Sequence, residues 1–232
     1  GKLGADWSYD QRKKQYVIQK IYRGDIWKAQ EHSPFAEPGC PVEEGDSILS
    51  IGGLAVNEHT SPEELLIQQA GQTIAMKIQK PQKKGKKQVV FVQSLPSDQK
   101  ARYRDWIHRN LQMVEEKTAG VVGYLHIPDM QTRGISEFHR GFLAQTDKQG
   151  LIIDVRYNAG GMVSPLILEK LAHQHLGYDI SRWGQAESYP YHTLRGHLLV
   201  LCNEFTGSDG DMFCYAFQAL QLGKVIGKRT WG

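Results

Sequence analysis

The second half of the chain alternates continuous apolar runs with segments of helical periodicity, and this order restricts its fold more than any other feature. The apolar runs occupy residues 121–128, 150–158, 197–202 and 224–227. Helical patterns lie between them, at residues 135–145, 163–177 and 212–220. Strands that are apolar throughout and alternate with helices are typical of a parallel sheet covered by helices. We therefore predict an α/β domain built from βαβ units.

The first part of the chain has the pattern of a small β-rich module. Strands are predicted at residues 16–22, 73–80 and 88–95, and residues 43–56 hold a Gly-Asp turn, a short apolar strand and a Gly-Gly turn. A short helix is marked by a run of start and stop signals, which are Ser61, Pro62, Glu64 and Gly71. A longer amphipathic helix follows, from a cap at Ser97 to Gly120. We predict two domains, residues 1–95 and residues 96–232.

Composition excludes several classes of protein. The chain has 232 residues, of which 40% are hydrophobic, and a formal net charge of +3. No apolar stretch approaches the roughly 18–20 residues of a membrane span, and the opening "GKLGADWSYD" lacks the apolar core of a signal peptide. We expect a cytoplasmic protein without a membrane span. A periplasmic or secreted location stays open, because a targeting segment can precede Gly1.

The three cysteines, Cys40, Cys202 and Cys214, lack the spacing of metal ligands. Cys202 and Cys214 lie in apolar runs, where thiols are commonly buried. We predict no metal site, no disulfide framework and no cofactor.

Lysines gather in the turn "PQKKGKK", at Lys83, Lys84, Lys86 and Lys87. Such a cluster suits a nucleic-acid contact or a solvated hairpin tip. No aromatic residue separates these lysines and the overall charge is low, which favours the hairpin tip and a protein without a nucleic-acid partner.

The segment "EFTGSDGDMF" (Glu204–Phe213) joins an apolar strand to a helix through Ser208. Ser208 can cap the helix by accepting bonds from its first amides, or it can be a nucleophile at the positive end of the helix. The turn Asn158–Gly161 occupies the equivalent place after another strand. Because ligands bind outside the carboxyl ends of parallel strands, the two turns would bring amides and a hydroxyl together, as acyl transfer requires.

The serine does not fit the nucleophile elbow Gly-x-Ser-x-Gly, because Thr206 stands in place of the first glycine. An α/β-hydrolase also carries its histidine after the serine, and residues 209–232 contain none. We therefore set that fold aside.

Residues 3–95 resemble a PDZ domain in the permuted order of bacterial processing proteases. The resemblance rests on "SPFAEPG", on Gly45-Asp46 with the apolar strand behind it, and on the capped helix after Ser61. It implies a groove between a strand and that helix, where an extended peptide can add as a strand.

A second resemblance is to the tricorn protease family, a group of tail-specific processing peptidases. It rests on "YRDWI", "VVGYLHIPDM", "DVRYNAGGMVSPLILEKL", "NEFTGSDGDMF" and "GKRTWG", and extends to "LGADW" and "IYRGDIW". The resemblance implies a crotonase-like catalytic domain of the ClpP/crotonase type, truncated at its carboxyl end. It implies Ser208 as the nucleophile and the backbone amides of Gly161 and Asp209 as oxyanion donors.

Asp179 matches the acid that in this family selects basic side chains before the scissile bond. A carboxylate there would pair with a substrate Arg or Lys. The alternative is an ordinary loop acid near the end of a helix.

A serine nucleophile needs a base. In the tricorn family the histidine precedes the PDZ domain and a supporting glutamate follows the final "RTWG", whereas simpler relatives use a lysine after that glycine. The "GSDGD" context favours the histidine arrangement. We therefore expect this chain to be a fragment of a homo-oligomeric protein and to be inactive, or nearly so, by itself.

Other polar residues of the second half are interpreted as structural. Asp154 and Arg156 are expected to form an ion pair. The histidines without an assignable partner are expected in the core or on the surface, at positions His108, His126, His139, His173 and His175.

The sequence thus predicts a serine endopeptidase that hydrolyses peptides. Two alternatives remain, a non-catalytic PDZ module that binds peptides and a crotonase-type acyl-CoA enzyme whose turns hold a thioester oxyanion. The attached PDZ region and the "GSDGD" serine argue against the acyl-CoA enzyme.

Overall fold

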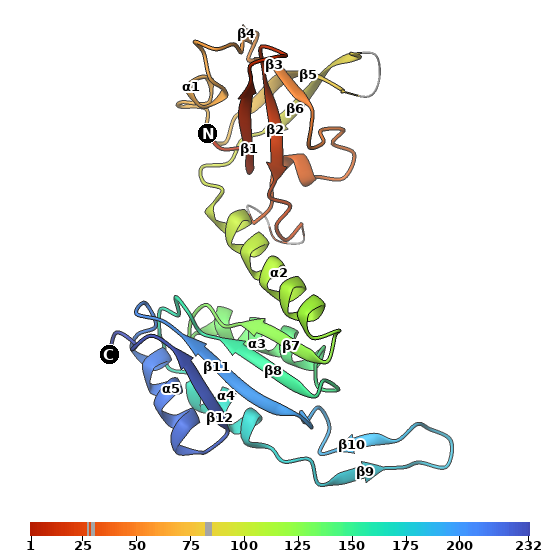
Figure 1. Cartoon of the computed structure of the whole chain (residues 1–232), viewed down its shortest axis with the longest axis vertical. Coiled ribbons are helices and arrows are strands. Elements are labelled where there is room, and N and C mark those ends of the chain that lie inside the picture. The colour runs from red at the N-terminus through yellow and green to blue at the C-terminus, as the bar shows by residue number, and fades with distance from the viewer. Residues whose placement is uncertain (27, 29–30, 82–84) are drawn as a thin grey trace. The chain divides into compact units, whose positions relative to one another are not determined.

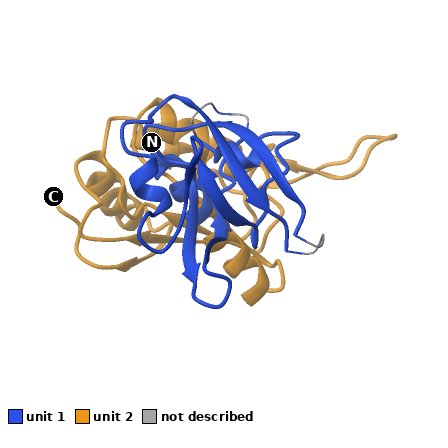
Figure 2. Cartoon of the chain, turned by 90° about the horizontal axis from the view of Figure 1, so that it is seen from above, with its two compact units in different colours: residues 1–106 blue, residues 107–232 orange. Residues whose placement is uncertain are grey.

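Figure 1 shows the computed structural model of the chain, which describes residues 1–26, 28, 31–81 and 85–232. The chain divides into two compact units, Gly1–Trp106 and Ile107–Gly232, coloured separately in Figure 2. Each unit has its own apolar core. The division between them lies inside helix α2 (Gln99–Lys117), and the predicted domain boundary between residues 95 and 96 lies just before that helix.

The first unit is built on an antiparallel sheet of order β1-β2-β3-β5-β6, with β4 paired to β3. Its strands are β1 (Ala5–Asp10), β2 (Gln15–Ile21), β3 (Ser47–Ile51), β4 (Leu54–Ala55), β5 (Thr73–Gln79) and β6 (Lys87–Gln93). Alternate residues of β5 are buried, namely Ile74, Met76 and Ile78. This period of two is expected where one face of a sheet covers the core and the other meets solvent.

Two short helical turns complete the first unit, η1 (Pro34–Ala36) and α1 (Pro62–Leu65). Helix α1 begins as predicted, because the Glu64 amide donates to Ser61 Oγ at 3.3 Å and Pro62 takes the first helical position. It ends at Leu65, whereas the sequence placed its end at Gly71.

The lysine turn is described in part. Lys83 and Lys84 lie outside the described residues. Lys86 and Lys87 are exposed at the start of β6.

The second unit has a four-stranded sheet of order β12-β11-β8-β7 in which every pairing is parallel. The strands are β7 (Val122–His126), β8 (Gly150–Asp154), β11 (His197–Cys202) and β12 (Gly223–Gly227). The prediction of a parallel α/β sheet is confirmed.

Three helices share one core with this sheet: α3 (Thr132–Leu143), α4 (Ser164–Ala172) and α5 (Asp209–Ala219). Phe138, Ile167 and Phe213, one from each helix, are fully buried in the same cluster as Ile153 and Val200 of the sheet. Since successive strand residues point to opposite faces, Asp154 lies on the face away from that core.

The remaining strands, β9 (Gly177–Asp179) and β10 (Glu187–Tyr189), pair antiparallel in a two-stranded ribbon. Figure 1 shows the ribbon extending away from the sheet of its own unit. The sequence did not predict it and instead continued the preceding helix to Gly177, five residues past its observed end at Ala172. Among the described residues, every helix is too short or too polar to cross a lipid bilayer.

Candidate active site

The carboxyl ends of the four parallel strands meet at one edge of the sheet, and three turns leave from that edge. Hydrogen bonds join these turns to one another. The Gly207 amide donates to the Asn158 carbonyl at 3.1 Å, which connects the turn after β11 to the turn after β8. The Met130 amide donates to the Gly160 carbonyl at 2.8 Å, which connects the turn after β8 to the segment after β7. The predicted convergence of the Asn158 and Ser208 turns is therefore confirmed.

Ser208 occupies the N-cap position of α5, but its side chain does not cap the helix. Its φ is +54° and its ψ is −126°, a combination that a residue with a side chain rarely adopts. Such a conformation costs on the order of 1–3 kcal/mol and persists where the surroundings impose it, often at functional sites. Ser208 is exposed, and in the described part of the chain its Oγ has no hydrogen-bond partner. The cap interpretation is wrong for this side chain, which leaves the hydroxyl available to a ligand.

Gly160 lies directly against Ser208. Its φ is +80°, and a Cβ added to it would lie 2.6 Å from Ser208 Cβ and 3.1 Å from Ser208 Oγ. Gly161 has a φ of +152°, and a Cβ there would lie 1.9 Å from the Met130 carbonyl oxygen. Both positions therefore require glycine, one for the approach to the serine and the other for the approach to the segment after β7.

Two backbone amides beside this contact are unused. Gly161 follows Gly160, and Asp209 is the first residue of α5, next to Ser208. No described residue accepts a hydrogen bond from the amide of Gly161 or of Asp209. Amides in the first turn of a helix carry the positive end of its dipole and attract anions.

The Asp209 carboxylate is fully engaged elsewhere. Its Oδ1 accepts from Ser164 Oγ at 2.6 Å and its Oδ2 from the Ser164 amide at 3.0 Å. This pair of bonds fastens the start of α4 to the start of α5. The negative charge also suits the N-terminal ends of both helices.

Buried polar side chains hold the turns in place. Asn158, 0% exposed, donates from Nδ2 to the Ile127 carbonyl and accepts the Gly160 amide at Oδ1, each at 2.8 Å. Thr206, also 0% exposed, donates from Oγ1 to the Val155 carbonyl at 2.8 Å. Each side chain supplies hydrogen bonds to buried backbone groups that would otherwise have no partner, because the segment is irregular.

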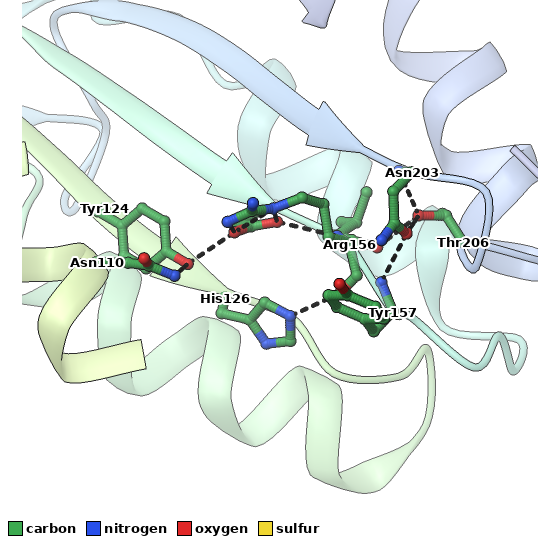
Figure 3. Close-up of polar contacts among 9 residues, drawn as sticks. Asn110, Tyr124, His126, Arg156, Tyr157, Asn203 and Thr206 are labelled. Atoms are coloured by element: carbon green, nitrogen blue, oxygen red, sulfur yellow. Dashed lines mark hydrogen bonds and ion pairs between the residues drawn. The ribbon is translucent and has the colours of Figure 1, made fainter. Parts of the chain in front are cut away.

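Asn203 supplies a further tie. Its Oδ1 accepts the Tyr157 amide at 3.0 Å and the Phe205 amide at 3.2 Å, so it joins the ends of β8 and β11. Figure 3 shows Asn203 and Thr206 beside Tyr157 at this edge of the sheet. The rings of Tyr157 and Phe205 stack, with centroids 5.5 Å apart.

A second polar cluster lies on the sheet face opposite α3, α4 and α5, where Asn110 of α2 donates to the Tyr124 hydroxyl at 3.1 Å (Figure 3). Asp154 pairs with Arg156, with Oδ2 2.6 Å from Nη2, and accepts the Tyr124 hydroxyl at 2.7 Å. Hydrogen bonds to Asp154 raise the pKa of Arg156. Burial, with the charge of Asp154, raises the pKa of the Tyr124 phenol. The predicted Asp154–Arg156 ion pair is confirmed.

His126 belongs to the same cluster. It is buried, and its Nε2 donates to the Arg156 carbonyl at 2.8 Å. Burial lowers the pKa of His126, which keeps the ring neutral. The expectation of a core histidine at this position is confirmed.

Asp179 is not brought to Ser208. It is exposed at the end of β9, opposite Glu187 of β10. The ribbon leads into the start of β11, whereas Ser208 follows the end of that strand. A six-residue strand spans about 20 Å. Within one chain, the two residues therefore lie toward opposite ends of the parallel strands.

Comparisons with known proteins identify both units. Residues 1–97 match the model of the tricorn protease PDZ domain, and residues 121–232 match the model of peptidase family S41. Over its whole length the chain is 41% identical to the tricorn protease of Thermoplasma volcanium and covers 22% of that protein. It is 40% identical to the putative tricorn-like protease C-terminal subunit of Sulfurisphaera tokodaii and covers 26% of that protein. It superposes on 22% of the crystal structure of the tricorn protease with a TM-score of 0.91 and 39% identity. The chain belongs to the tricorn protease family.

The chain spans about a quarter or less of the length of these tricorn relatives. Within this chain the match to the tricorn PDZ domain precedes the match to family S41. A more distant relative, at 25% identity over 84% of this chain, is the carboxyl-terminal-processing protease of Picosynechococcus. Among the described residues, no group of three or more His, Cys, Asp or Glu side chains could hold a metal ion.

Sequence reasoning missed the residues that support the turns in this tricorn-family segment. Asn158, Asn203 and Thr206 were read only as parts of loops. A signal was present, because small polar residues directly after two apolar strands are the residues expected to bond irregular backbone. Their burial could not be inferred, because it depends on how the two turns meet.

Proposed function

We propose that this chain is the PDZ and catalytic segment of a serine endopeptidase, with Ser208 as its nucleophile. The single observation that carries the proposal is the state of Ser208. Its hydroxyl is exposed and unpaired among the described residues, on strained backbone at the start of α5 and in contact with Gly160. Family membership supports the same activity, since both matched family models describe proteases.

The proposed reaction begins with attack of Ser208 Oγ on the carbonyl carbon of a peptide bond. The Oγ proton passes to a base, and the carbonyl π electrons move to its oxygen. The amides of Gly161 and Asp209 are the proposed donors to this oxyanion. Their lack of an acceptor in the described chain supports this role. Collapse of the adduct breaks the C–N bond, the protonated amine leaves, and water then hydrolyses the acyl-enzyme.

We propose that the base is a histidine outside these 232 residues, in accord with the resemblance to the tricorn family. His126 is a poor candidate, because its Nε2 is already bonded to the Arg156 carbonyl. The chain alone should therefore show little or no turnover of fluorogenic peptides. Robust hydrolysis by the purified chain, lost when one of its own histidines is replaced, would place the base inside it.

We also propose that the second unit is part of a crotonase-like fold. The parallel sheet with α3, α4 and α5 on one face, and the glycine turn placed against the serine turn, support this assignment.

Specificity is proposed to depend on assembly. Asp179 would select basic residues before the scissile bond by pairing with a substrate Arg or Lys. Its place on an exposed ribbon, at the edge of the sheet away from Ser208, favours action on the active site of a neighbouring copy in a homo-oligomer.

The first unit is proposed to bind peptide in the groove between β1 and α1. This groove has a volume of about 190 Å³, and its walls include Asp6, Trp7, Glu63 and Leu66. Trp7 Nε1 donates to Glu63 Oε1 at 2.6 Å and so bridges the two walls.

A fluorophosphonate reagent tests the nucleophile in the full-length protein. One labelled serine, located by mass spectrometry at Ser208 and absent from Ser208→Ala, is the expected result. An unlabelled protein that still binds peptide would instead identify a non-catalytic PDZ module. Binding of coenzyme A by an unlabelled protein would identify an acyl-CoA enzyme.

A further inference from the structure

Strand β6 leaves one edge of the first unit's sheet open. In the register of β5 and β6, the Lys80 amide bonds the Lys86 carbonyl and the Ser94 amide bonds the Gln72 carbonyl. Antiparallel pairing alternates bonded and non-bonded residues. The backbone groups of Val89, Phe91 and Gln93 therefore point away from β5, toward the free edge.

The chain itself shows how a strand is held at this edge. Lys2 and Leu95 exchange two antiparallel backbone hydrogen bonds, of 2.8 and 2.7 Å. The chain then turns away toward β1 at Gly4, whose φ is +61°. Beyond that point no described residue bonds the outward backbone groups of Val89, Phe91 or Gln93.

A cavity of about 840 Å³ lies beside the open edge. Its lining includes residues of β6 and of the segment from Pro34 to Pro41. In the middle of the strand the exposed side chains are apolar, with Val89 56% exposed and Phe91 72% exposed. An open strand edge with apolar side chains and a neighbouring groove is a template for adding another strand.

Charge at this edge is uneven. Lys86 and Lys87 are exposed where β6 begins, and Lys77 is exposed opposite Val89. The nearby acids Glu43 and Asp46 already pair with Lys80, at 2.8 and 2.9 Å. Among the described residues, Lys77, Lys86 and Lys87 have no ion-pair partner.

We propose that the open edge of β6 is a second peptide-binding site, which takes an extended segment with alternating apolar residues and acidic residues at its carboxyl-terminal end. An antiparallel strand, in the direction that Lys2 already follows, has its carboxyl-terminal end beside Lys87. Its apolar residues opposite Val89 and Phe91 cover those side chains. The site is separate from the groove between β1 and α1, and it does not depend on the proposed peptidase activity.

Fluorescence anisotropy on the 232-residue chain tests the proposal. The probe is a fluorescein-labelled heptapeptide with valine at alternate positions, glutamate at its last two positions and an amidated carboxyl end. The amide removes the free carboxylate that a PDZ groove can capture. Saturable binding, weakened about fivefold or more when lysines replace the glutamates or when salt is raised, is the expected result.

Val89→Pro isolates the backbone contribution. It removes an N–H that points to the free edge and leaves the bonds between β5 and β6 intact, a placement that proline tolerates on edge strands. Binding should weaken about tenfold, which corresponds to about 1.4 kcal/mol. Phe91→Ser, a change at an exposed side chain, should weaken binding as well and keeps the test decisive should the proline variant unfold.

Leu54→Ser, a change at an exposed apolar side chain of β4, is the matched control and should leave the affinity unchanged. No binding at millimolar chain concentration would overturn the proposal. So would binding lost in Glu63→Gln and retained in Val89→Pro, which would place the peptide in the groove between β1 and α1. Dimerisation through β6, seen by sedimentation and abolished by Val89→Pro, would show that a second copy is the occupant instead.

Discussion

The Ser208 turn and the Asp179 ribbon belong to the same unit but are held in different ways. The turn is fastened from several sides by buried groups, among them Asn158, Thr206 and the Ser164–Asp209 pair. The ribbon is exposed on most of its side chains, including Tyr178 and Tyr189. Among the described residues, its side-chain contacts outside the strands include a bond from Arg195 Nη1 to the Tyr178 hydroxyl at 2.8 Å.

The fastened turn and the exposed ribbon match two different requirements of a peptidase, which are the exact placement of a nucleophile and the recognition of a substrate side chain. A nucleophile has to be held within a fraction of an ångström of its productive position, which demands fixed neighbours in the same fold. A residue that recognises a substrate side chain can be positioned later, by assembly or by the substrate. We infer that the chain by itself preorganises the attack, while the selection of substrate depends on the ribbon's surroundings.

Ser208→Ala in the full-length protein is the largest expected effect. Loss of a nucleophile typically lowers turnover on the order of 10⁶-fold, and the folded state should survive because the Ser208 side chain makes no bond in the described chain. Peptide hydrolysis and circular dichroism measure the two. Ser188→Ala in the ribbon is the matched control and should keep full activity. A Ser208→Ala enzyme with most of its activity would remove this residue from the chemistry.

Gly160→Ala should be the next largest. The new Cβ would lie 2.6 Å from Ser208 Cβ and 2.9 Å from the Gly207 carbonyl oxygen, on a backbone with φ of +80°. Displacement of a reacting group by about 1 Å costs roughly 100-fold in rate. We expect kcat to fall by about this factor.

Gly177→Ala in the ribbon is the control for that substitution. A Cβ at Gly177 meets no atom within 4 Å, so kcat and thermal stability should not change. Equal losses in the two variants would show that the Ser208 turn is no more constrained than the ribbon.

The same contrast explains how far the sequence could predict this unit. The parallel sheet and the two turns could be predicted because apolar runs and glycine punctuation are local signals. The ribbon could not, because its residues carry no buried face and hence no alternation of apolar and polar residues. The preceding helix was extended across "HQHLG" for the same reason, since nothing local marks its end at Ala172.

In the first unit, strand β1 was missed although it lies in the sheet. Asp6, Ser8 and Asp10 make it polar, and the pairing with β2 that stabilises it is visible only in the fold. The same limit applies at the candidate active site. Ser208 was predicted from its neighbours in sequence, whereas the role of Asn158 depends on its contact with Ile127, thirty-one residues away.

Asp179→Asn tests the ribbon's proposed part in specificity. If Asp179 pairs with a substrate Arg or Lys, loss of its charge should cost roughly 2–5 kcal/mol in transition-state binding for basic peptides. That exceeds tenfold in kcat/KM, at about 1.4 kcal/mol per decade. Apolar peptides should be hydrolysed as before. Equal losses on both kinds of peptide, with a changed sedimentation coefficient, would point to damaged assembly instead.

The smallest expected effect concerns the ribbon itself. Glu187 stands directly opposite Asp179 in the β9–β10 register, and like charges at facing positions destabilise an antiparallel pair. Glu187→Gln removes that repulsion and keeps the size and shape of the side chain. The amide protons of β9 and β10 should then exchange more slowly, by a factor of about two to five, while those of α5 keep their rates. Glu187 forms a hydrogen bond with the Tyr191 hydroxyl, which raises the pKa of Tyr191. Faster exchange in the ribbon would show that this bond, and hence Glu187, stabilises the ribbon. Because the substitution leaves Asp179 in place, the preference for basic peptides should persist, which separates the order of the ribbon from the charge it presents.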